Sequence, residues 1–292
     1  MGTLEKKYYP LYLFVPALII FTIFYVGSLI GGAIFSFTNW NIHNFNNPKF
    51  IGLENFRDVF TSTSFTPALK NVVIFAIITT VVKVGLGICI ALLLNNKFRG
   101  RNFFRAISFL PCTIGTLVIG YIFSFILQPE TGILNIFLKS IGLESFALDW
   151  LGNPNLALYS VAGVESWIWI GFNVAILLAG LQSIPEEIYE AARIDGTNAI
   201  QRFTKITLPF LRPTINTTIT LCIIGGFNVF DIVMSMTNGG PNGATQVISK
   251  LSYDAMRSGT MGYASAINMV QLLLILLIIS PTLKLLKKGE DI

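Results

Sequence analysis

The sequence predicts an all-α polytopic membrane protein with six transmembrane helices. Two observations predict this class. Only 12% of the 292 residues are charged, about half the ~25% found in soluble domains, and 53% are hydrophobic. The apolar residues also lie in long, almost uncharged blocks, and about 20 such residues are enough to cross a bilayer. A soluble fold is therefore excluded.

Six blocks predict the spans in chain order. The first, residues 11–37, lies between Lys7 and Lys49 and is too long for the apolar core of a signal peptide, so we predict that it is retained. The remaining blocks are 69–94, 106–127, 156–181, 213–236 and 263–286. We expect them to form a single transmembrane domain over residues 1–292, with both termini on one side.

The basic residues predict which side that is. Of the 20 Lys and Arg residues, 13 flank the side of the termini and six flank the opposite side. The positive-inside rule therefore predicts cytoplasmic termini. The net charge of +5 reflects this topology, and we expect no nucleic-acid partner. The longer external loops, about 38–68, 128–155 and 237–262, are rich in Asn, Gly and Pro, which is typical of capped, folded surface.

The inventory of reactive side chains is poor. His43 is the only histidine, and the three cysteines fall inside apolar blocks. A Ser-His-Asp triad and a His/Cys metal site are therefore not expected, and we predict no catalytic residue, no metal ligand and no cofactor in this chain. The chain also lacks the G-x-x-x-x-G-K-[ST] phosphate-binding loop, so it cannot hydrolyse ATP by itself.

Three charged residues lie inside the predicted spans. A charge at the centre of a spanning helix costs at least ~2.5–3.5 kcal/mol unless it faces protein or water. Lys83 is near the middle of its block, whereas Asp231 lies late in the fifth block. We expect Lys83 to form an ion pair with either Glu165 or Asp231, because intramembrane charges commonly pair with one another.

The long inner loop, residues 182–212, is predicted to form two short helices. Ser183 with Glu186 fits a capping box, and Asp195-Gly196 should end the first helix. The second helix, about Asn198 to Ile206, should end at Pro209. An amphipathic helix lying on the membrane is the alternative, but the first helix opens with glutamates, which an anionic leaflet disfavours.

This loop carries a recognisable motif. Glu190-Ala191-Ala192 is followed after three residues by Gly196 and after nine more by Ile206-x-Leu208-Pro209. The pattern resembles the EAA loop of ABC-importer permeases at its full spacing. The resemblance extends over residues 10–285 and is to the carbohydrate-uptake branch, of the maltose and glycerol-phosphate type. Further matching stretches are Phe50–Phe56, Arg99–Arg105, Leu110-Pro111, Gly171–Asn173, Ala179–Pro185, Phe230-Asp231, Thr237–Pro241 and Gly262–Ala266.

The resemblance implies a type I ABC importer permease fold in which this loop is the coupling element. Its two helices would dock on a cytoplasmic ATPase and convert closure of the ATPase into helix movement. A helical hairpin with alanine at its contact face and glycine at its corner is stiff enough for such a lever. The residues carried over to this role are Glu190, Ala191, Ala192, Asp195, Gly196, Ile206, Leu208 and Pro209.

The resemblance also implies partners and a location. These are a second permease subunit, usually a different chain, a cytoplasmic ATPase dimer that uses ATP and Mg, and an extracellular solute-binding protein. The loop with Gly239, Gly240 and Pro241 would face that binding protein. The substrate would be a sugar, or a related polyol or glycerol-phosphate, moved across the bacterial cytoplasmic membrane by ATP-driven alternating access.

Polar and aromatic residues of the spans form the predicted substrate path. Sugars are held by aromatic faces together with a few placed amides and carboxylates. The fourth block contains Trp167 and Trp169, and Trp167 stands six residues before Asn173, a spacing that permits a shared cavity wall without requiring one. Membrane-interface anchoring or helix packing is an equally good interpretation of these tryptophans. The predicted path comprises Lys83, Glu165, Trp167, Asn173, Asn228 and Asp231.

Three other functions are weighed against the permease. A secondary transporter normally has an internal repeat with paired broken helices, and we find no repeat. A membrane-embedded enzyme needs a cluster of titratable groups at one depth, which one histidine and three intramembrane charges do not supply. A purely structural scaffold would not need a stiff acidic inner hairpin.

Overall fold

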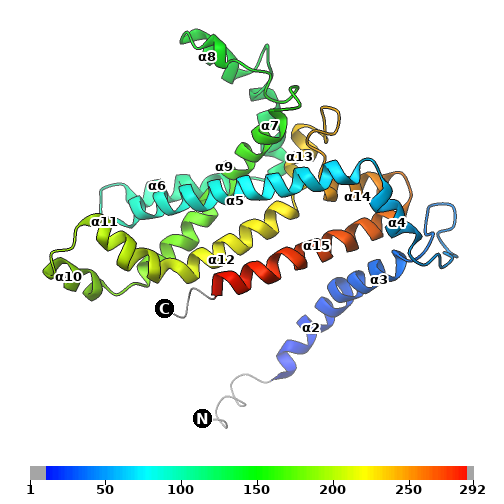
Figure 1. Cartoon of the computed structure of the whole chain (residues 1–292), viewed down its shortest axis with the longest axis horizontal. Coiled ribbons are helices and arrows are strands. Elements are labelled where there is room, and N and C mark those ends of the chain that lie inside the picture. Colours follow the sequence, from blue (N-terminus) through cyan, green and yellow to red (C-terminus); the bar gives the residue numbers. More distant parts are fainter. Residues whose placement is uncertain (1–10, 288–292) are drawn as a thin grey trace. The chain divides into compact units, whose positions relative to one another are not determined.

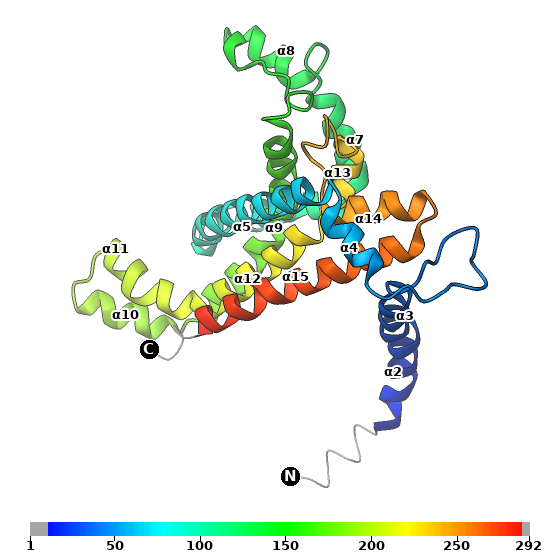
Figure 2. The ribbon, with the colours of Figure 1, turned by 45° about the vertical axis from the view of Figure 1, so that its right-hand side comes forward.

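The computed structural model describes residues 11–287, and every regular element in that range is a helix. The contacts divide the chain into two compact units, and the ribbon is drawn in Figures 1 and 2. The first unit contains the chain up to Phe65 together with Leu251–Leu272. The second contains Thr66–Lys250 and the chain from Leu273 onward.

The first unit begins with an uninterrupted helical run. Its elements are η1 (Leu11–Phe14), α2 (Val15–Phe21), the π-helical η2 (Thr22–Val26), α3 (Gly27–Phe35) and α4 (Glu54–Thr61), with the last residues of α14 (Ile248–Arg257) and the first part of α15 (Met261–Lys287). No residue of Val15–Phe35 is buried. A helix that is apolar on every face and uncovered is typical of a membrane span.

A folded loop follows α3 in the first unit. The buried side-chain amide of Asn55 donates to the carbonyl oxygens of Ser36 and Thr38, both at 2.8 Å. The backbone N–H of Gly262 donates to the Trp40 carbonyl oxygen at 2.7 Å. These bonds satisfy backbone groups that would otherwise need water. The prediction of a capped, ordered loop after the first span is therefore confirmed.

The second unit is built around one central helix, α9. Its elements are α5 (Phe65–Asn95, whose first residue lies in the other unit), α6 (Arg101–Phe109), η3 (Leu110–Thr113), α7 (Thr116–Ile126), α8 (Ile133–Ser140), η4 (Glu144–Phe146), α9 (Ala157–Gln182), α10 (Glu186–Ile194), α11 (Ala199–Arg202), the π-helical η5 (Phe203–Thr207), α12 (Leu208–Phe227) and α13 (Asp231–Met236). In both views α8 lies at one end of this unit, and α10 and α11 lie at the other (Figures 1 and 2).

Glycines allow neighbouring helices to approach α9 closely. A Cβ on Gly171 would overlap the backbone carbonyl of Ser108 on α6, and a Cβ on Gly180 would overlap the side chain of Thr214 on α12. Side chains from α5, α9, α12 and the turn after α9 then form a buried cluster. Its members are Ala91, Leu94, Val174, Leu177, Leu178, Leu181, Ile184 and Leu211. Such close packing makes this part of the second unit resist deformation.

Four helices of the described chain are long and apolar enough to cross a bilayer: Val15–Phe35, Phe65–Asn95, Ala157–Gln182 and Met261–Leu286. They coincide with the first, second, fourth and sixth predicted spans. Arg101–Thr113 and Thr116–Ile126 together count as a fifth if the pair is one span, although it is bent by 95°.

The third and fifth predicted spans are therefore not single helices. The third breaks after η3, where Ile114 and Gly115 are extended, and Pro111 lacks the N–H that would continue an α-helix. The fifth ends as α12 at Phe227 and resumes as α13 at Asp231. After this break, α13 packs on α7. The two helices approach closely, since a Cβ on Gly120 of α7 would overlap Ser235 of α13.

Candidate functional site

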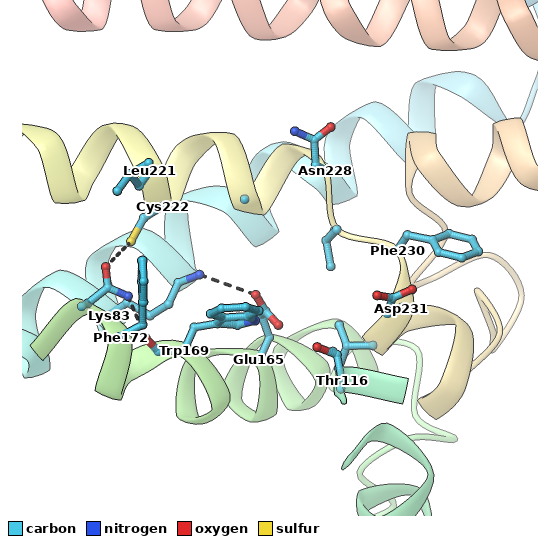
Figure 3. Close-up of a pocket in the computed structure, with 14 residues that line it drawn as sticks. Lys83, Thr116, Glu165, Trp169, Phe172, Leu221, Cys222, Asn228, Phe230 and Asp231 are labelled. Atoms are coloured by element: carbon cyan, nitrogen blue, oxygen red, sulfur yellow. Dashed lines mark hydrogen bonds and ion pairs between the residues drawn. The ribbon is translucent and has the colours of Figure 1, made fainter. Parts of the chain in front are cut away.

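A cavity of about 350 Å³ lies where the two broken helices of the second unit meet. Thr116 reaches it from the start of α7, and residues 228–230 reach it from the break between α12 and α13. Helices α5, α9, α12 and α13 supply the remaining lining residues (Figure 3). Non-helical backbone within a membrane protein is tolerated where it lines a cavity or is buried in protein. Both breaks therefore mark the same candidate site.

A buried ion pair crosses this cavity. Lys83 Nζ on α5 lies 3.6 Å from Glu165 Oε1 on α9, and the two side chains are only 4% and 8% exposed. Figure 3 shows the two groups pointing toward each other. The prediction of a paired Lys83 is confirmed, and its partner is Glu165. Asp231 contributes a second carboxylate at an exposed position of the same cavity.

Aromatic and amide groups complete the cavity wall. The Trp169 indole lies beside the Glu165 carboxylate (Figure 3). The Asn173 side-chain amide donates to the Trp169 carbonyl oxygen at 2.8 Å, and the Cys222 thiol donates to Asn173 Oδ1 at 3.1 Å. These bonds fix the orientation of the amide. The cavity thus combines an aromatic face, an oriented amide and charged oxygens, which is a composition suited to a polar ligand with apolar faces.

Five of the six residues of the predicted path line this cavity: Lys83, Glu165, Asn173, Asn228 and Asp231. Trp167 does not. Its ring lies against Phe123, with the ring centroids 5.4 Å apart, and Trp169 takes the place in the cavity. Residues four, seven and eight positions after Glu165 share its helical face, and these are Trp169, Phe172 and Asn173. Counting by fours from either Glu165 or Asn173 would have identified Trp169.

The inner loop forms a helical hairpin that comprises α10, α11 and the turn 195–198. Gly196 has φ +73° and ends α10, as predicted from Asp195-Gly196. The Ala192 carbonyl oxygen accepts from both the N–H and the hydroxyl of Thr197, at 3.1 and 2.6 Å. A capping box between Asn198 and Gln201 begins α11. The turn is thus stabilised by its own hydrogen bonds.

Two details of the predicted hairpin are wrong. Ser183 does not cap α10, because its hydroxyl donates backward to the Gly180 carbonyl oxygen at 2.8 Å and Pro185 occupies the N-cap position. The second helix does not end at Pro209. It continues through η5 into α12, with the Leu208 N–H bonded to the Phe203 carbonyl oxygen. This π-turn sets Pro209 in the first turn of α12, where a missing N–H is tolerated.

The residues carried over from the motif differ in how far the structure exposes them. Glu190, Ala191, Asp195, Gly196, Leu208 and Pro209 are exposed, Ile206 is half-buried, and Ala192 is buried inside the hairpin. Two side chains that the sequence analysis did not single out are more exposed than expected for their type: Ile194 at 86% and Ile200 at 74%. On the inner side, Tyr189 packs against the buried cluster and hydrogen-bonds the Thr207 hydroxyl at 3.0 Å.

The loop with Gly239, Gly240 and Pro241 follows α13. Gly239 has φ +88°, and the Gly240–Pro241 peptide bond is cis. The Thr245 hydroxyl donates to the Gly240 carbonyl oxygen at 2.7 Å. The Asn71 side-chain amide donates to the carbonyl oxygens of Gly243 and Gln246, at 3.1 and 3.0 Å. The loop is therefore tied to α5.

Broken helices around a buried ion pair, together with a motif-bearing hairpin at one end, are features of a transport protein of the membrane. The chain belongs to the family of binding-protein-dependent transport system inner membrane components, whose sequence profile matches residues 83–284. The family predicted from the sequence is confirmed. The chain is thus a permease component of an ABC transport system and not an enzyme.

Several relatives match almost the whole chain. The probable ABC transporter permease protein YurN of Bacillus subtilis is 36% identical over 291 residues, which is 98% of this chain and 99% of the relative. The multiple sugar-binding transport system permease protein MsmF of Streptococcus mutans is 32% identical over 291 residues, 98% and 97% of the two chains. The trehalose/maltose transport system permease protein MalF of Thermococcus litoralis is 34% identical over 241 residues, 82% and 80% of the two chains.

Solved structures share the fold. A chain of a bacterial ABC transporter involved in the import of the acidic polysaccharide alginate aligns with a TM-score of 0.82 and 25% identity, and covers 97% of both chains. A second structure of a bacterial alginate ABC transporter, in complex with an alginate pentasaccharide-bound periplasmic protein, aligns with a TM-score of 0.81 over 95% of this chain and 94% of the other.

Proposed function

We propose that this chain is a membrane subunit of a carbohydrate importer and that the cavity between α5, α9 and the two helix breaks is part of its sugar path. The relatives named above are described as permeases for multiple sugars and for trehalose and maltose. The observation that carries the proposal is the paired Lys83 and Glu165 in a cavity with aromatic and amide walls. Hydroxyl groups can bond the charged and amide groups while the sugar face lies on the indole.

The helical hairpin is the proposed contact for a cytoplasmic ATPase. Glu190, Ala191 and Asp195 present exposed acidic and small groups, and Gly196 sets the corner. Charged contacts of this kind fix orientation more than affinity. On its inner side, Tyr189 touches the buried cluster of α5, α9 and α12, helices that also line the cavity. A displacement of the hairpin would thereby reach the cavity through close-packed side chains.

The remaining parts of the proposal concern topology and partners. The six predicted blocks form one permease domain with cytoplasmic termini in a bacterial cytoplasmic membrane. The bent pair of Arg101–Thr113 and Thr116–Ile126 forms the third span, and α12 together with α13 forms the fifth. A second permease subunit completes the path, an ATPase dimer supplies ATP and Mg chemistry, and a solute-binding protein docks near Gly239, Gly240 and Pro241. The structural relative solved with a periplasmic protein supports that last partner.

The two tryptophans of α9 provide the test. The transporter would be reconstituted in proteoliposomes with its binding protein, and ATP-dependent uptake of labelled sugar would be measured for Trp169→Leu and Trp167→Leu. Trp169 lines the cavity, whereas Trp167 packs on Phe123 outside it. We expect Trp169→Leu to lower uptake about tenfold, which corresponds to about 1.4 kcal/mol, and Trp167→Leu to stay within about twofold. If both variants assembled equally well and lost uptake equally, the assignment of the cavity to the sugar path would be contradicted.

A further inference from the structure

A basic hollow at the turn between α5 and α6 has no assigned role. It has a volume of about 490 Å³ and is formed by residues 97–103, which include Lys97, Arg99 and Arg101. None of these three cations forms an ion pair or a side-chain hydrogen bond with any residue of the described chain, and residues 97–105 contain no acid. The hollow is therefore a concentration of positive charge, and the acid that shares a recess with one of its cations is Glu186, which lines a separate recess together with Lys97.

The neighbouring Arg105 shows that this charge is not needed to close the turn. Its guanidinium donates to the Leu94 carbonyl oxygen at 3.1 Å, and this bond ties the start of α6 to the end of α5. Lys97, Arg99 and Arg101 make no comparable contact. Arg101 also occupies the first turn of α6, whose N-terminus has neither a side-chain cap nor an acidic residue. A cation at that end of a helix is unfavourable unless an anion lies nearby.

An apolar groove adjoins the basic hollow. It has a volume of about 430 Å³ and is lined by Ile90, Leu93 and Leu94 of α5, by Phe104 and Ser108 of α6, and by Asn96 and Phe98 of the turn. Phe98 lines both the groove and the basic hollow. The Phe98 and Phe104 rings lie 6.0 Å apart, and both are exposed. The two recesses thus share one aromatic wall.

We infer that this pair of recesses binds one anionic phospholipid, with its phosphate headgroup in the basic hollow and an acyl chain in the apolar groove. Charge complementarity favours an anion in the first recess, and the exposed apolar side chains of α5 and α6 favour hydrocarbon in the second. A free phosphate would use only the first recess. Basic clusters beside a spanning helix are a known means of attracting anionic lipid, with a contribution of about 1 kcal/mol for each Lys or Arg.

Native mass spectrometry of the full chain in a neutral detergent tests this site. Phosphatidylglycerol and phosphatidylcholine with identical acyl chains would be titrated separately. We expect the wild-type chain to retain phosphatidylglycerol at least tenfold more tightly. Arg99→Gln should weaken that retention roughly fivefold, and the triple variant Lys97→Gln, Arg99→Gln, Arg101→Gln should remove the preference. Phe98→Ala should weaken retention of both lipids while their ratio stays unchanged.

Lys139→Gln on α8 is the matched control, because it removes one exposed cation outside both recesses. It should bind as wild type. Soluble glycerol 3-phosphate should not displace the lipid, because it lacks the acyl chain. Equal retention of the two lipids by wild type would overturn the inference, as would a triple variant that elutes as a folded chain and keeps the preference. The inference would also be overturned if the triple variant retained the lipid as wild type does but no longer copurified with the ATPase. That result would assign the basic surface to the ATPase instead.

Discussion

The cavity and the helical hairpin of the second unit are stabilised in different ways. Residues that form the cavity come from distant parts of the sequence, as the pair of Lys83 with Glu165 illustrates, and the side chains of this pair are almost fully buried. The hairpin instead relies on bonds between near neighbours, such as those from Thr197 to Ala192 and between Asn198 and Gln201. The cavity therefore depends on the packing of the whole unit, whereas the turn of the hairpin depends mainly on its own backbone.

This difference has a consequence for transport. A segment with local hydrogen bonds keeps its shape when it is displaced, so that a push on it is transmitted rather than absorbed. A cavity built from distant helices changes shape when those helices move. The contact of Tyr189 with both Thr207 and the buried cluster lies between the two regions. Breaking the buried ion pair of the cavity should therefore act mainly on stability, and substitutions in the hairpin should act mainly on coupling.

The largest effect is expected from breaking the ion pair. Glu165→Leu leaves the buried ammonium of Lys83 without its partner, and removal of one member of such a pair typically costs about 3–5 kcal/mol. Lys83→Met should be similarly harmful. The double variant Lys83→Met, Glu165→Leu should recover much of the loss, because no buried charge remains unpaired.

Thermal unfolding of the purified chain in detergent would measure this cycle. The control is Asp231→Asn, because this exposed carboxylate belongs to the same cavity but is not the ion-pair partner in the structure. It should unfold close to wild type. Strictly additive losses in the double variant would show that Lys83 and Glu165 do not stabilise each other.

A smaller effect on stability, with a large effect on uptake, is expected at the corner of the hairpin. Gly196 has φ +73°, and a Cβ there would meet nothing within 4 Å, so Gly196→Val acts only through the backbone. Strain of this kind costs about 1–3 kcal/mol. Because the corner deforms, we expect ATP-dependent uptake in proteoliposomes to fall at least tenfold while the variant still assembles with its partners.

Gly142→Val is the matched control for that experiment. Gly142 has φ +79° and also has open space around it, but it follows α8 at the other end of the unit. It should be destabilised to the same extent and retain uptake. If the two valine variants lost uptake equally, a general loss of stability would explain the result and the proposed coupling role of the corner would be rejected.

The sequence predicts those features of both regions that depend on local chemistry. Charges within apolar blocks identified Lys83 and Glu165, and Asp195-Gly196 identified the end of α10, because burial cost and left-handed backbone act wherever those residues stand. The EAA spacing identified the family through residues 190–209. Four of the six predicted spans are unbroken helices in the structure, since long apolar runs have few alternatives to helix.

Features that depend on tertiary contacts could not be predicted in this way. The break before α13 contains no proline, and its position accompanies contact between Gly120 and Ser235, more than 100 residues apart. Pro209 suggests a helix end by local rules, yet the π-turn of η5 absorbs the missing N–H and the helix continues. The choice of Trp167 over Trp169 for the predicted path is a different case. Trp169 lies on the helical face of Glu165, so helix geometry alone was enough to select it.

The smallest effect on stability, and the sharpest test of the comparison, is expected at the exposed apolar tip of the hairpin. Ile200 is 74% exposed, so Ile200→Ser should change the free energy of unfolding by less than about 0.5 kcal/mol. If this side chain contacts the ATPase, the same substitution should still weaken copurification of that subunit about fivefold, because an apolar contact of the interface is lost.

Ile133 on α8 is 70% exposed, so Ile133→Ser controls for the general effect of replacing an exposed isoleucine. It should leave both stability and copurification unchanged. A hairpin variant that unfolds more easily yet holds the ATPase normally would reverse the assignment, because the tip would then stabilise the chain itself rather than serve a partner.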